Sequence, residues 1–338
     1  MANIKDVAKE AGVSIASVSR VLAERPGVGK KTRQRVMQAI QALDYRPDPA
    51  AQRLRSRRNH TIGLIVSDIR NPFFTEISRA VEDMAYQHRM RVILCNADED
   101  PEKEALYLDL MRDEHVSGVI LSPSLSILAR FQRSDYPFPV VLVDRCERET
   151  VADAVVLDNT DSAYRLTAHL IEQGYRRILF IYDATSATGR QRYQGYVTAM
   201  ATGGLQTQIK VVPTPVRETV NVTHAIVSEL VQGQQLPDAL IGSNGLILLG
   251  IMKALREMGL QFPEQIALAG FDDSPWTQLQ GPGITVIAQP VYDIGQAAAE
   301  LLLQRIAHSS QPVRRVVLSG ELRERGSTAR RISDQSAN

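Results

Sequence analysis

Polar and aromatic side chains follow many of the short apolar segments of this 338-residue chain, and their types suit a sugar. These candidates are Ser67, Asn71, Phe73, Phe74, Asp144, Arg145, Thr188, Arg190, Arg192, Asn244, Asp272, Trp276 and Gln289. Carboxylates and amides form hydrogen bonds with vicinal hydroxyls, while aromatic rings cover the apolar face of a sugar. The three arginines in the set bind carboxylates or phosphates in a bidentate manner. The set therefore predicts a sugar site and favours an anionic effector, such as an aldonate, a ketogluconate or a sugar phosphate.

Each candidate also has a purely structural explanation. The two phenylalanines could anchor a hydrophobic core, and Asp272 could cap its own loop. Trp276, the only tryptophan, could lie on an exposed loop. The arginines could pair with Asp144, Asp183 or Asp272 instead of a ligand, so a neutral sugar stays open as an alternative effector.

The elements that must position these residues alternate along the chain from residue 61. Apolar runs rich in β-branched residues occupy 61–66, 91–95, 116–121, 139–143, 154–157, 177–182, 209–212, 239–242, 266–271 and 284–288. Helical stretches separate most of them, at 73–88, 101–114, 159–173, 190–201, 246–258 and 291–307. This alternation predicts an α/β fold with parallel sheets covered by helices on both faces. The number of strands favours two lobes, and ligands of such sheets bind at the carboxyl ends of the strands.

Motifs for catalysis are absent from the sequence. It contains no G-x-S-x-G, H-E-x-x-H, C-x-x-C or G-x-G-x-x-G pattern. The segment GVGKKT at 27–32 lacks the first glycine and the final hydroxyl residue of a phosphate-binding loop. The 6 histidines are scattered and the 2 cysteines are too few for a structural zinc site. We therefore expect no enzyme, no metal and no cofactor; a glycosidase with paired acids in its cleft is the enzyme alternative.

The first 60 residues differ in charge from the rest of the chain. They hold 13 Lys and Arg against 5 Asp and Glu, a net charge of +8, whereas the remainder holds 26 against 33, a net charge of −7. A basic head on an acidic body is expected when one segment binds a polyanion. The N-terminus lacks the apolar core of a signal peptide, and no apolar run is long enough to span a bilayer. These features predict a soluble cytoplasmic protein without a membrane partner, and argue against a stand-alone periplasmic sugar-binding protein.

The basic head has the pattern of three short helices. Asn3 and Asp6 form a capping-box pair, Gly12 ends the first helix and Ser14 caps the second. A third helix is expected over about 32–43. Two short helices joined by a glycine turn and supported by a third predict a helix-turn-helix, although a small bundle with a solvated basic face is the alternative. The second helix of such a motif lies in the major groove of DNA.

The predicted DNA contacts lie at the start of that second helix and just after the third. They are Ser14, Ile15, Ala16, Ser17, Ser19, Arg20 and Tyr45. Serine hydroxyls donate to phosphate oxygens, and Arg20 can bind a guanine edge in a bidentate manner.

The segments that carry these features resemble the lactose-repressor (LacI/GalR) family. IKDVAKEAGVSIASVSRVL and TRQRVMQAIQALDYRP resemble its DNA-binding head, and the similarity continues through TIGLIVSDIRNPFF and IALAGFDDSPW. One departure is Gly29, where the family usually has a serine that caps the third helix; glycine is itself a tolerated cap. The resemblance implies a helix-turn-helix domain at 1–47, a hinge at 48–60 and a two-lobe body at 61–330, similar to periplasmic binding proteins. Its first lobe would comprise 61–160 and 290–320, its second 161–289 and 321–330, with crossovers near 158–162, 287–291 and 319–324.

The resemblance also implies a mechanism. Two hinges, one per subunit, would fold together in the minor groove, where Leu54 wedges between base pairs and Arg55 lies beside it. Arg192, Asn244 and Asp272 fall on positions at which family members hold their ligand. The chain is then expected to be a homodimeric repressor of near-palindromic operator DNA, regulated by a sugar-like effector. Because its C-terminus RRISDQSAN lacks a leucine heptad, we expect a dimer rather than a tetramer.

Overall fold

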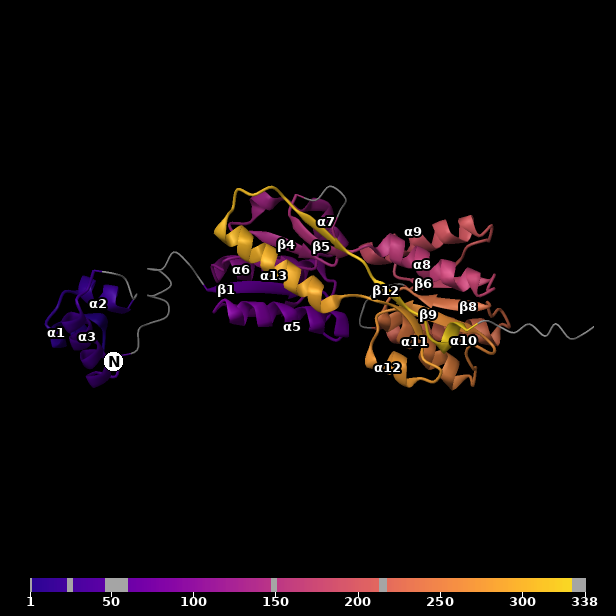
Figure 1. The fold of residues 1–338 in the computed structure, drawn as a ribbon, viewed down its shortest axis with the longest axis horizontal. Coiled ribbons are helices and arrows are strands. Elements are labelled where there is room, and N and C mark those ends of the chain that lie inside the picture. Colours follow the sequence, from indigo (N-terminus) through magenta and orange to yellow (C-terminus); the bar gives the residue numbers. More distant parts are fainter. Residues whose placement is uncertain (1, 23–26, 46–59, 147–150, 213–217, 330–338) are drawn as a thin grey trace, which may run out of the picture. The chain divides into compact units, whose positions relative to one another are not determined.

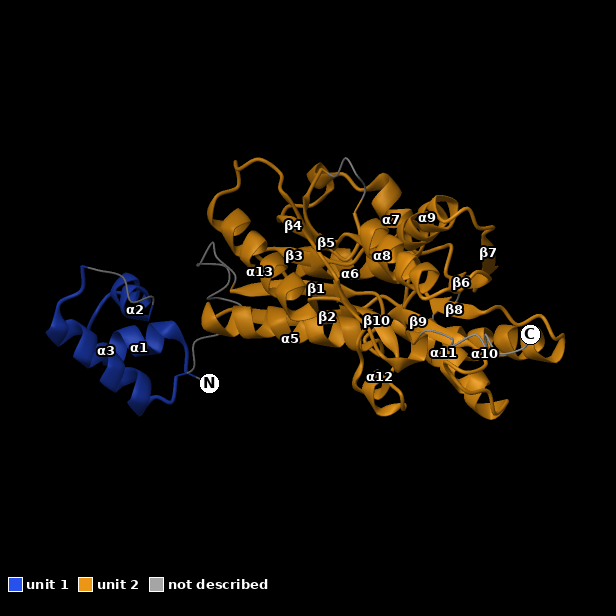
Figure 2. Ribbon diagram, turned by 45° about the vertical axis from the view of Figure 1, so that its right-hand side comes forward, with its two compact units in different colours: residues 1–59 blue, residues 60–338 orange. Residues whose placement is uncertain are grey.

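The computed structural model describes residues 2–22, 27–45, 60–146, 151–212 and 218–329. It consists of two units, residues 1–59 and residues 60–338, which Figure 2 shows in blue and orange. The predicted hinge contacts Leu54 and Arg55 lie outside the described residues. Each unit is described by itself below.

The described residues of the first unit form three helices, α1 (Ile4–Glu10), α2 (Ile15–Leu22) and α3 (Lys30–Ala42). The Asn3 side chain accepts from the backbone of Asp6, whose carboxylate accepts in turn from the Asn3 N–H at 2.9 Å, which confirms the capping box. The Ser14 Oγ accepts from the Ser17 N–H at 3.1 Å and caps α2. α3 begins after Gly29 without a side-chain cap. The apolar sides of the three helices form one core that includes Val7, Val18, Val21, Val36 and Ala39.

The second unit contains two six-stranded sheets. The first has the order β11-β5-β4-β3-β1-β2 and is parallel throughout. Its strands are β1 (Thr61–Val66), β2 (Arg91–Asn96), β3 (Val119–Leu121), β4 (Val140–Val143), β5 (Asp153–Leu157) and β11 (Arg315–Leu318). The second has the order β12-β10-β9-β8-β6-β7, in which only β12 is antiparallel to its neighbour. Its strands are β6 (Ile178–Tyr182), β7 (Gln208–Val211), β8 (Ala239–Gly242), β9 (Ala267–Phe271), β10 (Thr285–Ala288) and β12 (Glu321–Arg323).

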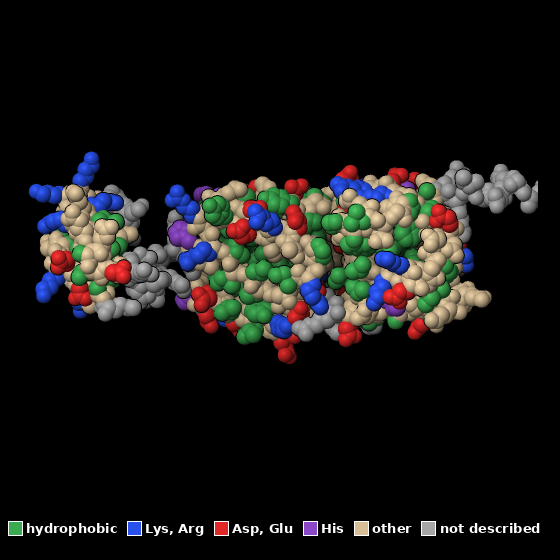
Figure 3. Space-filling view, turned by 90° about the horizontal axis from the view of Figure 1, so that it is seen from below, with side chains coloured by type: hydrophobic (Ala, Val, Ile, Leu, Met, Phe, Trp, Pro, Cys, Tyr) green, Lys and Arg blue, Asp and Glu red, His purple; other side chains and the backbone are tan. Residues whose placement is uncertain are grey.

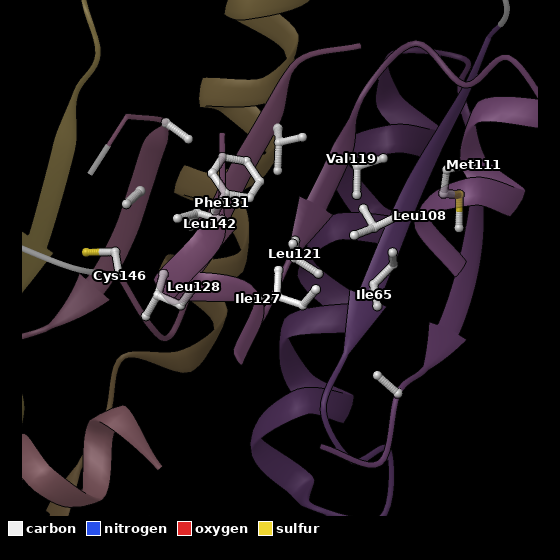
Figure 4. Packing of buried hydrophobic residues seen from close by; sticks show 14 of the residues in the cluster. Ile65, Leu108, Met111, Val119, Leu121, Ile127, Leu128, Phe131, Leu142 and Cys146 are labelled. Carbon is white, nitrogen blue, oxygen red and sulfur yellow. The ribbon is translucent and has the colours of Figure 1, made fainter. Parts of the chain in front are cut away.

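Helices cover both faces of each sheet (Figure 1). The first lobe, built on the first sheet, carries α5 (Pro72–Gln87), α6 (Pro101–Asp113), α7 (Leu125–Arg130) and α13 (Val291–Ala307). The second lobe, built on the second sheet, carries α8 (Asn159–Glu172), α9 (Ala187–Thr202), α10 (Thr219–Gln232), α11 (Gly245–Glu257) and α12 (Pro275–Leu279). Each sheet separates two hydrophobic clusters. Figure 4 shows one of them, in which Ile65 of the first sheet lies beside Leu108 of α6, Leu121 beside Ile127 of α7 and Leu142 beside Phe131.

The chain passes between the lobes three times. The first crossover leads from β5 to α8, the second from β10 to α13 and the third from β11 to β12. In Figure 1 the yellow α13 accordingly lies on the first lobe, beside α5, although it follows the second lobe in the sequence. These crossovers fall in the three segments predicted from the family resemblance, and they place the carboxyl ends of strands from both lobes around one cleft.

Candidate ligand-binding cleft and DNA-binding head

The two lobes repeat one arrangement at the edge of the cleft. Asp144 directly follows β4 and Asp272 directly follows β9, and both have a positive φ, of 70° and 74°. The backbone N–H of Asp144 donates to Val155 in β5, and that of Asp272 donates to Ile287 in β10, each over 3.0 Å. Left-handed backbone at a non-glycine residue is strained, and such strain clusters at functional sites. The geometry thus brings one carboxylate from each lobe to the same cleft.

A cavity of about 60 Å³ lies at these strand ends. Ten of the thirteen predicted residues line it: Asn71, Phe73, Phe74, Asp144, Arg145, Thr188, Arg192, Asn244, Asp272 and Gln289. Its described lining also includes six residues that were not predicted: Asp68, Glu99, Asp183, Ser186, Thr219 and Leu246. Asp68 and Asp183 carry the same signal as the predicted residues, a position just after a strand. Glu99 lies in the loop before α6 and Thr219 is the first residue of α10, and neither position carries such a signal.

Three predicted residues do not line this cavity. The Ser67 Oγ is buried and hydrogen bonds with the Ser122 Oγ at 3.2 Å. The exposed Arg190 donates from Nε to the carbonyl of Ala184 at 2.6 Å. Trp276 packs against the core beneath α11 and lines a different groove, of about 600 Å³, between α10, α11 and α12.

Arg145 is held by two carboxylates of the first lobe. Its Nη2 lies 2.5 Å from the Glu99 Oε1, and its Nε donates to the Asp144 Oδ2 at 2.9 Å. Burial by itself lowers the pKa of Arg145, but the charges of Glu99 and Asp144 raise it above its ordinary value. Burial also raises the pKa of Asp144, against the pull of Arg145. Arg145 is thus a permanent cation whose charge the protein itself neutralises.

Arg192 is buried without such neutralisation. Its Nε donates to the Asn159 Oδ1 at 2.8 Å, its Nη1 donates to the Ser243 carbonyl at 2.6 Å, and its guanidinium lies 4.0 Å above the Phe271 ring. Within the described parts of the chain, no carboxylate forms an ion pair with it. Burial lowers the pKa of Arg192, although the charge of Asp272 partly offsets this.

Asp272 and Gln289 form a connected pair. The Asp272 Oδ2 accepts from the Gly245 N–H at 2.8 Å, and its Oδ1 accepts from the Gln289 Nε2 at 2.5 Å. Because a carboxylate can only accept here, the amide nitrogen of Gln289 must face it. The Gln289 Oε1 is left buried without a partner among the described residues. An unpaired buried acceptor is unfavourable, so this atom calls for a donor from a ligand or from water.

Helix starts supply further polar groups to the cavity. The Asn71 Oδ1 caps α5 by accepting from Phe73, and the Asn244 Oδ1 caps α11 by accepting from Ile247 at 2.9 Å. Since each amide oxygen is used in the cap, its amide nitrogen is the group that remains for a ligand. Phe73 and Phe74 pack edge to face, with ring centres 5.1 Å apart, and belong to the core as well as to the lining.

The predicted DNA contacts lie on the outer side of the head. Ser14, Ile15, Ala16 and Arg20 are exposed, Ser17 and Ser19 are half-buried, and Val18 and Val21 face the core. Tyr45 is half-buried against that core. Figure 3 shows Lys and Arg side chains projecting from this unit. α2 therefore presents hydroxyls, one arginine and one apolar side chain together, as a major-groove helix does.

Comparisons with known proteins identify the family of this chain. Residues 3–48 match the model described as bacterial regulatory proteins, lacI family, and residues 167–328 match the periplasmic binding protein-like domain. The chain is 35% identical to the Ribose operon repressor of Halalkalibacterium halodurans over 90% of this chain and 91% of the relative. It belongs to the lacI family. It is also 33% identical to the HTH-type transcriptional regulator PtxS of Pseudomonas plecoglossicida over 96% of this chain and 95% of that protein.

Solved structures of lacI-family regulators share the fold. A lacI-family regulator from Enterococcus faecium with bound ribose has a TM-score of 0.70 and 27% identity over 80% of this chain and 99% of its own. The lac repressor dimer bound to operator has a TM-score of 0.83 and 23% identity over 97% of this chain and 99% of its own. The predicted helix-turn-helix head and two-lobe α/β body are confirmed, and the chain is a DNA-binding transcriptional regulator. Among the described residues, no helix has the length and hydropathy to cross a membrane, and no three His, Cys, Asp or Glu side chains cluster as a metal site would require.

Proposed function

We propose that this regulator is a homodimeric repressor whose operator affinity is controlled by a neutral monosaccharide bound in the cleft. The charge balance of the cavity carries this proposal. Five carboxylates and two arginines are among the described residues that line it. Of the three arginines that favour an anionic effector, Arg190 lies outside the cavity and Arg145 is neutralised by Glu99 and Asp144. A further anion would meet more negative than positive charge there.

The free hydrogen-bonding groups support the same ligand class. The Gln289 Oε1 needs a donor, and the carboxylate of Asp272 can accept further hydrogen bonds. The amide nitrogens of Asn71 and Asn244 are donors. A polyhydroxyl compound matches both kinds of group, because each hydroxyl donates one hydrogen bond and accepts others.

The names of several relatives support a neutral sugar. One is a ribose operon repressor, one solved structure holds ribose, and another is described as a transcriptional regulator CelR–cellobiose complex, at 26% identity and a TM-score of 0.70. These ligands are neutral sugars. They support a neutral sugar here as a class, without assigning a particular one.

A sugar acid is the second candidate, and Arg192 is the observation that favours it. A buried guanidinium without a carboxylate partner among the described residues can bind the carboxylate of a ligand. Burial lowers the pKa of Arg192, however, and the charges of Asp272 and Asp144 act in the opposite direction, so both carboxylates already stabilise its positive charge. We therefore place the neutral sugar first.

Calorimetric titration with matched pairs separates the two candidates. D-ribose is compared with D-ribonate, and D-glucose with D-gluconate, on the full-length protein. We expect the better neutral sugar to bind about tenfold more tightly than its acid, which corresponds to about 1.4 kcal/mol. The opposite ranking overturns the neutral assignment in favour of the sugar acid. Arg190→Ala, which changes a residue outside the cavity, is the control and should leave both affinities unchanged.

The proposed binding of operator DNA rests on the helix-turn-helix head. Two heads in a dimer bind two half-sites of a near-palindromic operator, and phosphate contacts make the affinity dependent on salt. The hinge contacts Leu54 and Arg55 complete this proposed interface. A sugar that binds one arrangement of the two lobes more tightly than another shifts the protein towards that arrangement. Coupling of this kind changes the affinity for the second ligand, here the operator, by about 5- to 150-fold.

A further inference from the structure

The loop after β9 carries two adjacent carboxylates with different partners. Asp272 lines the cavity, whereas Asp273 binds the third crossover. We propose that Asp273 is a positioning residue that couples the ligand held at Asp272 to the crossover strand β12. This inference rests on the proposed function of the cleft. It identifies how a ligand bound in the cavity affects the third crossover.

Four polar contacts converge on the Asp273 carboxylate. The Arg323 Nη1 lies 2.5 Å from its Oδ2, and the Arg325 Nη2 donates to the same oxygen at 2.8 Å. The Arg325 Nη1 lies 2.8 Å from its Oδ1, which also accepts from the Thr277 Oγ1 at 2.9 Å. Both arginines come from β12 or the residues just after it. Asp273 therefore joins the loop after β9 to the segment that has just left the first lobe.

The burial of this cluster makes its charges effective. The Asp273 side chain is only 7% exposed, and that of Arg325 is 18% exposed. Burial alone raises the pKa of Asp273, but its hydrogen bonds with Arg325 and Arg323 lower it to about 2. Partly buried pairs are screened by salt much less than surface pairs. The carboxylate thus stays charged and bound under any ordinary condition.

β12 itself pairs with the sheet over a short length. It contains three residues and pairs with one neighbour, β10, through Val286, Ile287 and Ala288. In Figure 1 the yellow segment that ends in β12 runs from the first lobe into the second. Asp273 is therefore one of the side chains that hold this segment in the second lobe, together with Thr285, whose Oγ1 accepts from the Arg325 N–H at 2.9 Å.

Asp272 connects the same loop to the ligand. It accepts from Gly245 and from Gln289, which lies on the second crossover, and its φ of 74° fixes the backbone just before Asp273. The first crossover is tied in a similar way, because Asn159 accepts from the cavity residue Arg192. The third tie differs from the other two, since Asp273 itself does not line the cavity. It can be removed without deleting a ligand contact.

The test uses hydrogen exchange of the full-length protein, followed at residues 319–325, with and without saturating D-ribose. In the wild type we expect D-ribose to slow exchange there by about fivefold. In Asp273→Asn this ratio should fall to about one, while the D-ribose affinity changes by less than about threefold. A merely structural role raises exchange equally with and without sugar and leaves the ratio at the wild-type value, which overturns the proposal. Glu321→Gln removes the other carboxylate that binds Arg323 and is the matched control, with an unchanged ratio.

A second arm needs no ligand and keeps the inference separate from the proposed function. Asp272→Asn is combined with Asp273→Asn in a double-mutant cycle, with exchange at 319–325 as the readout. Coupling predicts that Asp272→Asn speeds this exchange in the wild-type background and adds nothing in the Asp273→Asn background. Additive effects overturn the inference. If D-ribose gives no binding heat, D-glucose replaces it; if neither neutral sugar binds, the proposed ligand class fails and this cycle alone decides the role of Asp273.

Discussion

The Nε of Arg192 donates to the Oδ1 of Asn159 over 2.8 Å and so joins a cavity side chain to the first residue of α8, just past the first crossover. The Nη1 of the same guanidinium is used by the Ser243 carbonyl. Two protein contacts thus fix the plane of Arg192, and Nη2 is the nitrogen that remains for a ligand. A fixed, planar donor is what distinguishes arginine from lysine at such a site.

Arg192→Lys should therefore weaken sugar binding although it keeps the positive charge. The ammonium of lysine cannot reproduce the donor geometry, and loss of a hydrogen bond that involves a charged group costs about 1.5–3 kcal/mol, or about 10- to 150-fold in affinity. Calorimetry with the best-binding sugar measures the loss. Arg190→Lys is the matched control on the same helix, because Arg190 donates to the Ala184 carbonyl away from the cavity. Equal affinities for the wild type and Arg192→Lys would contradict this role.

Glu99→Gln should change which ligands bind. Glu99 has a left-handed backbone conformation, with a φ of 60°. Its carboxylate forms an ion pair with Arg145 and balances the positive charge of that side chain. With glutamine there, Arg145 keeps a single carboxylate partner, Asp144, and the cavity gains one unit of positive charge. We expect the affinity for D-ribonate relative to D-ribose to rise by about tenfold. Glu102→Gln, an exposed change three residues along, is the control; an unchanged ratio in Glu99→Gln would show that Glu99 does not set ligand charge.

The buried strands and the long helices were predictable because burial alone sets the pattern of apolar residues in each of them. Strands covered on both faces are apolar throughout, so the run 61–66 coincides with β1, and the helical period places a helix at 73–88, where α5 spans Pro72–Gln87. The run 209–212 also located the edge strand β7, although all four of its residues are exposed. The edge strands β11 and β12 escape this signal, because they have too few buried side chains to stand out. α10 was missed because its valines and threonines lower helix propensity, and it forms by packing on α11 at Gly250.

The cleft was predictable to the extent that it depends on strand ends. Asp144 and Asp272 follow strands and line the cavity. The partner of Arg145 was not predictable, since Glu99 lies 46 residues earlier, in a loop. Trp276 follows β9 as Asp272 does, but it sits on α12, which turns towards α10 and α11. Position after a strand therefore locates the cleft, whereas the pairing of charges within it depends on the tertiary structure.

Glu104 should make stability depend on pH. Its side chain is buried in the first lobe, where both carboxylate oxygens accept from the Ser124 N–H at 3.0–3.3 Å. Burial raises the pKa of Glu104 from 4.5 to about 7, and the charge of Glu99 adds to this. Because the folded state holds this proton more tightly than the unfolded state, the free energy of unfolding falls as pH rises from 4.5 to about 7, and it stays lower above that.

Glu104→Gln lacks this titration and keeps an oxygen that can accept from Ser124. Its free energy of unfolding relative to the wild type should therefore rise by up to about 3 kcal/mol across this window, since one pKa unit is worth about 1.4 kcal/mol. Urea unfolding of both proteins from about pH 5 to about pH 8 measures the difference. The exposed Glu102→Gln on the same helix should show no such trend. A difference between Glu104→Gln and the wild type that is flat with pH would contradict the expectation.

Arg20→Met tests whether α2 reads bases. Arg20 is exposed near the end of α2 and is the one residue of this helix that can bind a guanine edge through two hydrogen bonds. Using a near-palindromic operator selected by the wild type from random DNA, we expect a loss of about 1–3 kcal/mol in binding and relaxed preference at one position of each half-site. Lys9→Met, which removes an exposed charge from α1, is the control. If both variants lose affinity uniformly across sequences and differ only in salt dependence, Arg20 contacts phosphate instead.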